Sequence, residues 1–242
     1  MFLHIADIFV IYFGNASDMI YPQAYLTMPA DIFFAKTESI QRIIVQLQLT
    51  HLFFAQQVHG INGIQVTPAL LAGTPAFTTQ ADFLYTETTA VGIGIMTADC
   101  LPIVFVDPVN GSIAIIHAGW RGAIQNIVQK ALEHMHMAYG TKPSNILVFL
   151  GPSARACCYR VGPEFVAIAA QDNLCRDVLE ERAEKLFFDV PRLVHNQLSA
   201  AGVQPQSISQ EYNLCTMCDT RFYSHRRDAQ RSGRQMTIVT LA

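Results

Sequence analysis

Short runs that are apolar at almost every position are the feature that most constrains the fold of this chain. They are rich in Val, Ile and Phe, and they predict strands at residues 52–58, 91–96, 102–106, 112–117, 145–150 and 236–241. A strand with two apolar faces must be covered on both sides. The pattern therefore predicts a sheet that is buried between other layers of structure.

Two stretches show the three-and-four spacing of a helix with one buried face. The first follows Gly122 and is expected to stop at Gly140. The second has Asp189 as its N-cap and Pro191 in its first turn, and Gly202 closes it. Helices that alternate with buried strands predict a three-layer α/β/α fold with a mixed sheet. The strand order stays open.

Length and composition favour one domain that spans residues 1–242. With 242 residues, 51% hydrophobic and 14% charged, the chain can fill a sizeable core. The net charge is −3 and the pI is about 6.2, so the chain offers no basic field for nucleic acid or an anionic membrane. We therefore expect a monomer that acts on a small molecule.

The amino-terminal sequence MFLHIADIFVIYFG is apolar, but Asp7 interrupts it and the first Lys or Arg is Lys36. A secretory signal needs a positive beginning, and a membrane span needs roughly twenty apolar residues. We therefore expect a cytoplasmic protein. In a reducing compartment the six cysteines are expected to be thiols.

Three residues could carry chemistry together: His59 in QVHG, Cys100 in TADC and His117 in IHAGWRG. The turn-forming sequence DPVNG predicts a hairpin between residues 102–106 and 112–117, which places Cys100 and His117 at the same end. Two imidazoles and a thiolate can hold one zinc ion and leave a coordination position open. The same groups could form a Cys/His hydrolase, or each could be a buried structural residue. Spacing alone does not bring His59 to the other two.

Two charged residues adjoin this trio. Asp99 could accept a hydrogen bond from a ligand histidine or shuttle a proton, or it could cap a turn or a helix. Arg121 lies in GWRG and could bind phosphate in a bidentate manner, or it could be a solvated residue at a helix start.

Other conspicuous groups favour structural roles. Cys157 and Cys158 are adjacent, which makes joint chelation of one metal difficult and favours burial. Cys215 and Cys218 have a zinc-ligand spacing, but no second pair follows, which favours coincidence. A carboxyl-terminal basic cluster favours a solvated face or internal carboxylate partners; its members are Arg226, Arg227, Arg231 and Arg234.

Several motifs in order resemble one family. QVHG, TADCLPIVFVD, IAIIHAGWRG, GPSARACCYRVGPEF and the segment from NLCTMC to the carboxyl terminus are similar to the YfiH/YlmD family, also called the multicopper polyphenol oxidase or laccase-domain family. The resemblance implies an α/β/α fold likened to the catalytic domain of cytotoxic necrotizing factor. It also implies zinc bound by His59, Cys100 and His117.

The resemblance further implies phosphorolysis of adenosine, guanosine, inosine and methylthioadenosine, with adenosine deamination in the same pocket. Cys100, His117 and Asp99 would be catalytic, and Arg121 would bind phosphate. Copper and phenol oxidation are less favoured, because the only HxH pair among the eight histidines is His134 with His136.

Two alternatives stay open. The first is a metal-free amidase or hydrolase, for example one that edits cell-wall precursors, with Cys100 as nucleophile and His117 as base. The second is a binding protein without enzyme activity. The chain also departs from the family pattern, because Arg160 stands where Glu is common. The changed charge would alter substrate preference.

Overall fold

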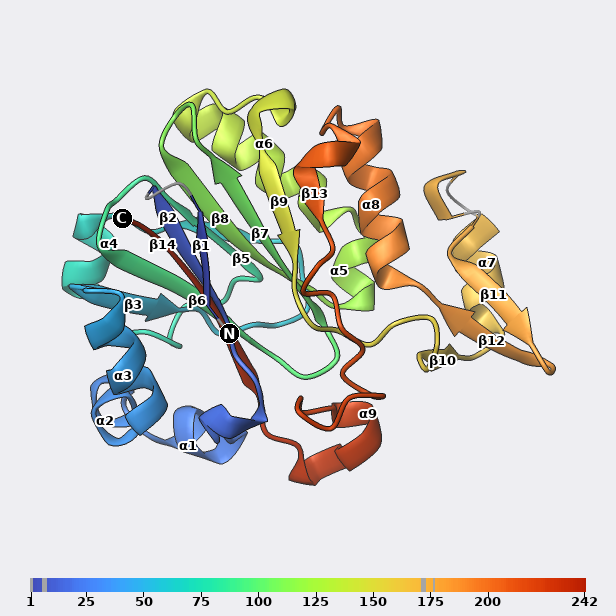
Figure 1. Ribbon diagram of the computed structural model, residues 1–242, viewed down its shortest axis with the longest axis horizontal. Coiled ribbons are helices and arrows are strands. Elements are labelled where there is room, and N and C mark those ends of the chain that lie inside the picture. The colour runs from blue at the N-terminus through green and yellow to red at the C-terminus, as the bar shows by residue number, and fades with distance from the viewer. Residues whose placement is uncertain (1, 6–7, 171–172, 176) are drawn as a thin grey trace.

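Two stacked β-sheets form the centre of the computed structural model, which describes residues 2–5, 8–170, 173–175 and 177–242 (Figure 1). The first sheet has the order β1-β2-β14-β6-β3 and is mixed, since β3 runs parallel to β6 and the other neighbours are antiparallel. Its strands are β1 (Phe2–Ile5), β2 (Phe9–Phe13), β14 (Gln235–Leu241), β6 (Val91–Thr97) and β3 (His51–Phe54).

The second sheet has the order β13-β9-β7-β8-β5-β4 and is also mixed. Its strands are β13 (Ile208–Ser209), β9 (Leu147–Leu150), β7 (Leu101–Asp107), β8 (Ser112–Ala118), β5 (Phe83–Thr86) and β4 (Gly63–Gln65). The predicted hairpin is confirmed as β7 and β8, which pair antiparallel with Pro102 opposite His117.

The two sheets bury one apolar face of each against the other. Ile11, Ile93 and Val239 of the first sheet share a buried core with Val104 and Ile115 of the second. Helices cover the outer faces, so the strands need two apolar faces, as their sequences indicated. The predicted mixed α/β architecture with helices on both sides is confirmed. Its β layer consists of two sheets rather than one.

The helices of residues 127–139 and 190–200 cover the second sheet, and those of residues 30–46 cover the first (Figure 1). Leu132 and Leu193 pack on the second sheet, while Phe33, Ile40 and Ile43 pack beside the first. The helices are α1 (Pro22–Thr27), α2 (Ala30–Lys36), α3 (Glu38–Gln46), α4 (Pro68–Gly73), α5 (Trp120–Ile124), α6 (Ile127–Tyr139), α7 (Glu164–Ala170), α8 (Val190–Ala200) and α9 (His225–Asp228).

The first predicted helix is divided in two, which corrects the expectation of one helix after Gly122. Asn126 adopts a left-handed conformation with φ 58° and its side chain accepts a hydrogen bond from Gln129 N, so α6 begins anew there. Gly140, with φ 72°, ends α6 as predicted. The Asp189 N-cap of α8 is confirmed, since its side chain accepts from Arg192 N.

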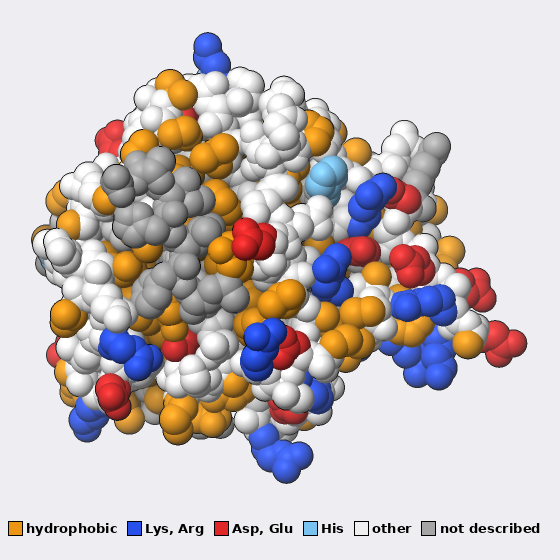
Figure 2. All heavy atoms as spheres, in the orientation of Figure 1, with side chains coloured by type: hydrophobic (Ala, Val, Ile, Leu, Met, Phe, Trp, Pro, Cys, Tyr) orange, Lys and Arg blue, Asp and Glu red, His pale blue; other side chains and the backbone are white. Residues whose placement is uncertain are grey.

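A small third sheet, β10-β12-β11, protrudes beside α7 (Figure 1). Its strands are β10 (Arg160–Val161), β12 (Lys185–Phe188) and β11 (Leu179–Arg182). Figure 2 shows acidic and basic side chains gathered on this protrusion. Within the described part of the chain, no helix has the length and apolar character needed to cross a membrane.

Candidate metal centre

The three residues of the predicted trio converge in space. One possible ligand atom from each of His59, Cys100 and His117 lies within 4.8 Å of the others. His117 belongs to β8 and is 3% exposed, and Cys100 directly precedes β7, so the hairpin brings both to one end of the sheet. His59 comes from the loop after β3 and is exposed. The sequence alone did not show that His59 lies near the other two residues, and the fold brings it there.

Asp82 organises this centre and was missed by the sequence reasoning. Its carboxylate is fully buried, and Oδ1 accepts hydrogen bonds from His117 Nδ1 at 2.8 Å and from His59 N at 2.9 Å. Oδ2 accepts from Gly60 N at 2.6 Å. Asp82 thus orients one imidazole and holds the loop that carries the other, in which His59 has φ 62°. An acidic residue directly before the apolar strand β5 was the available signal.

The charges of the centre stabilise one another. Burial raises the pKa of the Cys100 thiol, but the imidazoles of His117 and His59 outweigh it and bring that pKa down to about 6. Burial lowers the pKa of His117, but the Cys100 thiolate and Asp82 raise it to about 9. Burial also raises the pKa of Asp82, yet its bond to His117 leaves the value below the ordinary one.

The residues present fit a zinc ion. Two imidazoles and a thiolate are a ligand set typical of a catalytic zinc site, and Asp82 supplies the carboxylate that such histidines usually contact. Gly119 leaves room beside the ligands, because a Cβ there would lie 3.0 Å from His59 Cδ2 and 3.3 Å from Cys100 Sγ. The site could therefore hold a metal with one side open.

A cavity of about 180 Å³ opens on this centre. Arg121 is exposed at its wall, with its guanidinium 4.4 Å from the centre of the Trp120 ring. A second cavity of about 210 Å³ reaches His59 from another side. The first cavity is lined by two aromatic and several charged side chains, among them Trp120, Tyr159, Asp99, Arg121, His225 and Arg226.

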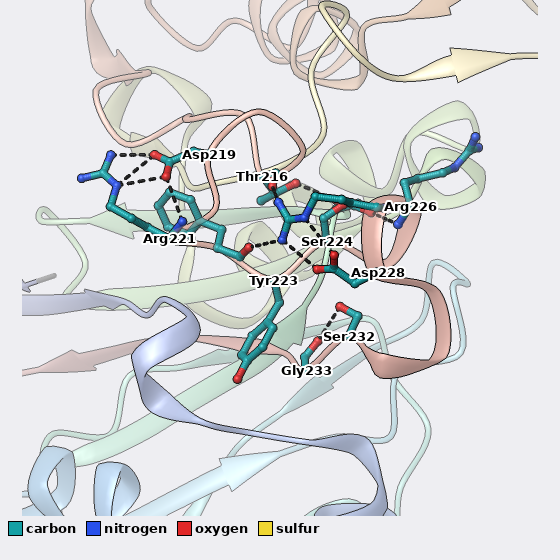
Figure 3. Close-up of polar contacts among 12 residues, drawn as sticks. Thr216, Asp219, Arg221, Tyr223, Ser224, Arg226, Asp228, Ser232 and Gly233 are labelled. Atoms are coloured by element: carbon teal, nitrogen blue, oxygen red, sulfur yellow. Dashed lines mark hydrogen bonds and ion pairs between the residues drawn. The ribbon is translucent and has the colours of Figure 1, made fainter.

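Asp99 lines the cavity, but its carboxylate contacts the loops rather than a ligand histidine. Oδ1 accepts from Thr216 Oγ1 at 2.6 Å and Oδ2 accepts from Arg226 N at 2.7 Å, in the region drawn in Figure 3. The capping role is therefore the one that the contacts support. The hydrogen bond to a ligand histidine belongs to Asp82 instead.

Two interpretations of the outlying groups are revised. Cys157 is exposed and Cys158 is half-buried, so structural burial is wrong for this pair. Both lie in a cluster with Cys215 and Cys218, so the CTMC pair has two further thiols beside it, which the sequence did not indicate. In the basic cluster, Arg227 pairs with Asp228 at 2.7 Å, as expected for an internal carboxylate partner. Arg226 lines the cavity and stacks 4.8 Å from the Tyr159 ring centre.

The fold and the site define a class: an α/β protein with two stacked central sheets and a His₂Cys centre at the end of a hairpin. The family model described as multi-copper polyphenol oxidoreductase laccase matches residues 34–242. The chain belongs to this family, which is the one that its motifs resemble.

Curated relatives agree with this assignment, and a solved structure shares the fold. The chain is 35% identical over 162 residues to a protein of Aquifex aeolicus named purine nucleoside phosphorylase, covering 67% of this chain and 72% of the relative. It is 30% identical over 164 residues to mouse purine nucleoside phosphorylase LACC1, covering 66% of this chain but only 38% of that protein. A crystal structure of Bacillus licheniformis YfiH superposes with a TM-score of 0.84 at 23% identity, covering 100% of this chain and 99% of the other.

Proposed function

We propose that the chain is a zinc-dependent purine nucleoside phosphorylase. The observation that carries this proposal is the convergence of His59, Cys100 and His117 beside a cavity whose walls include His59 and Cys100 together with aromatic rings and two arginines. Relatives at about 30% identity that are named purine nucleoside phosphorylase support an enzyme of this kind. The proposed substrates are adenosine, guanosine, inosine and methylthioadenosine, with adenosine deamination as a second reaction.

His59, Cys100 and His117 would hold the zinc ion. When bound there, zinc would supply Lewis acidity. Asp82 accepts from His117 Nδ1, which leaves Nε2 of that ring for the metal. The buried carboxylate also fixes the backbone of the loop around His59, so both histidines are held before any ligand arrives.

The cavity walls fit the two parts of a phosphorolysis reaction. The Trp120 and Tyr159 rings offer apolar surface for a purine base, and the Arg121 and Arg226 guanidinium groups that stack on these rings offer charge for phosphate. A phosphate oxygen would form a bond to the anomeric carbon of ribose while the glycosidic C–N bond breaks. The base would leave with a proton, and ribose 1-phosphate would remain. Asp99, which anchors Arg226 N, would keep the arginine wall in place.

A product assay tests the proposal. Zinc-loaded protein is incubated with each nucleoside with and without phosphate, and the products are separated by chromatography. We expect free base and ribose 1-phosphate only when phosphate is present. Inosine formed from adenosine without phosphate would support the deamination. If saturating nucleoside and phosphate yield no base, the proposal is wrong.

One observation favours a second candidate, a metal-free cysteine hydrolase. Cys100, His117 and Asp82 are aligned as nucleophile, base and orienting carboxylate, and the pKa of the Cys100 thiol is lowered to about 6. Chelation separates the two functions. Amide hydrolysis that survives removal of metal and disappears on alkylation of Cys100 would favour the hydrolase, whereas loss of nucleoside turnover on chelation would favour the phosphorylase.

A further inference from the structure

A second cluster of metal-ligating side chains lies outside the His₂Cys centre. Cys157 and Cys158 occupy a turn in which Cys158 N donates to Arg155 O at 2.9 Å. Cys215 and Cys218 occupy another turn, closed by the bond from Asp219 N to Cys215 O at 3.0 Å. The sulfur atoms of all four cysteines lie within 4.8 Å of one another.

The sulfurs gather closely around Cys218, as expected for ligands of one shared cation rather than for isolated thiols. Cys218 Sγ lies 3.0 Å from Cys158 Sγ and 3.6 Å from Cys157 Sγ. Tetrahedral zinc with Zn–S bonds of about 2.3 Å holds its sulfurs about 3.8 Å apart. A disulfide would use only two of the four cysteines, whereas Cys218 approaches both Cys157 and Cys158. The fold of their turn therefore removes the difficulty that the adjacency of these two cysteines suggested for joint chelation.

The backbone around Cys215 is arranged to receive negative charge on its sulfur. The backbone N–H groups of Arg155, Cys218 and Met217 lie near the Cys215 sulfur. Donation from backbone amides stabilises a thiolate, which is the form that binds metal. These donors come from both turns, so the turns share one electrostatic environment.

We propose that Cys157, Cys158, Cys215 and Cys218 form a structural zinc site. On binding, the four thiols give up their protons to solvent and the site is closed by protein ligands alone. No open position is left for chemistry, which distinguishes this site from the His₂Cys centre. Exposure of Cys157 and Cys218 gives the ion a path from solvent.

The position of the cluster gives it a role in the cavity. Beside it, Ser153 N donates to Leu214 O and Thr216 N donates to Ser153 O, both at 3.0 Å, so the two loops already pair. The first loop continues to Tyr159, a wall of the cavity, and the second carries Thr216, which contacts Asp99. Zinc bound here would fasten two walls of the cavity together.

Metal analysis of the full chain tests this site independently of any activity. Purified protein loaded with zinc and freed of loose metal should hold two ions, and Cys100→Ala should still hold one. Adding Cys218→Ser to Cys100→Ala should remove that ion, whereas adding Cys175→Ala should not, because Cys175 is a buried cysteine outside both clusters.

A spectroscopic measurement keeps the proposal testable if Cys218→Ser fails to fold. Cobalt-loaded Cys100→Ala retains all four cysteines, and it should show intense visible bands and sulfur-to-cobalt charge transfer typical of tetrahedral thiolate ligation. Absence of zinc and of these bands in Cys100→Ala would overturn the proposal. So would a mass 2 Da lower in the protein purified under reducing conditions, with Cys158 and Cys218 recovered in one disulfide-linked peptide. The readout is metal content and ligation, so failure here leaves the phosphorylase proposal unaffected.

Discussion

Replacing Asp82 by Asn is the substitution that most sharply tests how the His₂Cys centre is held. The change keeps the size of the side chain but removes its charge and one of its two acceptor oxygens. At present Oδ1 accepts from His117 Nδ1 and His59 N, and Oδ2 accepts from Gly60 N and, at 3.3 Å, from Val58 N. In the variant, the amide NH₂ must face either the imidazole or the Gly60 N–H. One buried donor therefore loses its partner.

The expected magnitude follows from these contacts. Leaving one buried donor unsatisfied costs about 1–3 kcal/mol. Loss of the carboxylate behind a ligand histidine typically weakens metal binding by about 10–100-fold, which corresponds to about 1.4–2.8 kcal/mol. The first figure concerns the stability of the fold and the second the affinity for metal, so Asp82→Asn should raise the zinc dissociation constant of this centre by one to two orders of magnitude.

The dissociation constant is measured by competition with a chromophoric chelator, in a Cys215→Ser/Cys218→Ser background so that only this centre is titrated. Asp107→Asn is the matched control. Asp107 is also fully buried, but its Oδ1 accepts from Val109 N and Asn110 N in the turn at the far end of the hairpin. An unchanged constant in Asp82→Asn, or an equal loss in Asp107→Asn, would refute the reasoning.

Three further predictions concern the groups around the centre. Arg121→Ala should raise the KM for phosphate about tenfold with zinc still bound, since one charge-assisted contact to an exposed group is lost. The control is Arg221→Ala, because Arg221 pairs with Asp219 and does not line the cavity. An unchanged phosphate KM in Arg121→Ala would contradict its role. In metal-free protein the pKa of Cys100 is about 6, so the thiol is about nine-tenths ionised at pH 7. The rate of its alkylation, followed by peptide mass, should therefore no longer increase above pH 7. A rate that rises tenfold per pH unit up to pH 9 would contradict this. Gly119→Ala should weaken zinc binding several-fold, because its Cβ would lie 3.0 Å from the His59 ring. Gly73→Ala, with open space around it, should leave zinc binding unchanged. Equal zinc dissociation constants for the two variants would show that the ligands do not need that space.

The fold was predictable where sequence patterns are long and local. The apolar runs that became β6, β7, β8 and β14 were recognised, because strands buried on two faces are apolar at almost every position. Short strands such as β4 and β10 carry too few residues for a pattern. The stacking of two sheets could not be predicted either, because a strand has the same apolar sequence pattern whether a sheet or a helix covers it.

The site was predictable in its ligands but not in its support. The hairpin argument correctly placed Cys100 beside His117, because a turn sequence fixes which strand ends meet. The approach of His59 depends on three backbone N–H groups gathering on Asp82, a contact between segments more than twenty residues apart. The four-cysteine cluster joins turns about sixty residues apart, and spacing within either pair gives no sign of the other.

The most direct test of the central proposal is the rate of phosphate-dependent base release by Cys100→Ala, compared with Cys175→Ala. Both variants remove one thiol, but only Cys100 belongs to the His₂Cys centre. We predict that Cys175→Ala keeps phosphorolysis and that Cys100→Ala loses both the zinc of this centre and all measurable turnover, because the only anionic ligand is gone. Phosphorolysis at the original rate in Cys100→Ala would contradict the account.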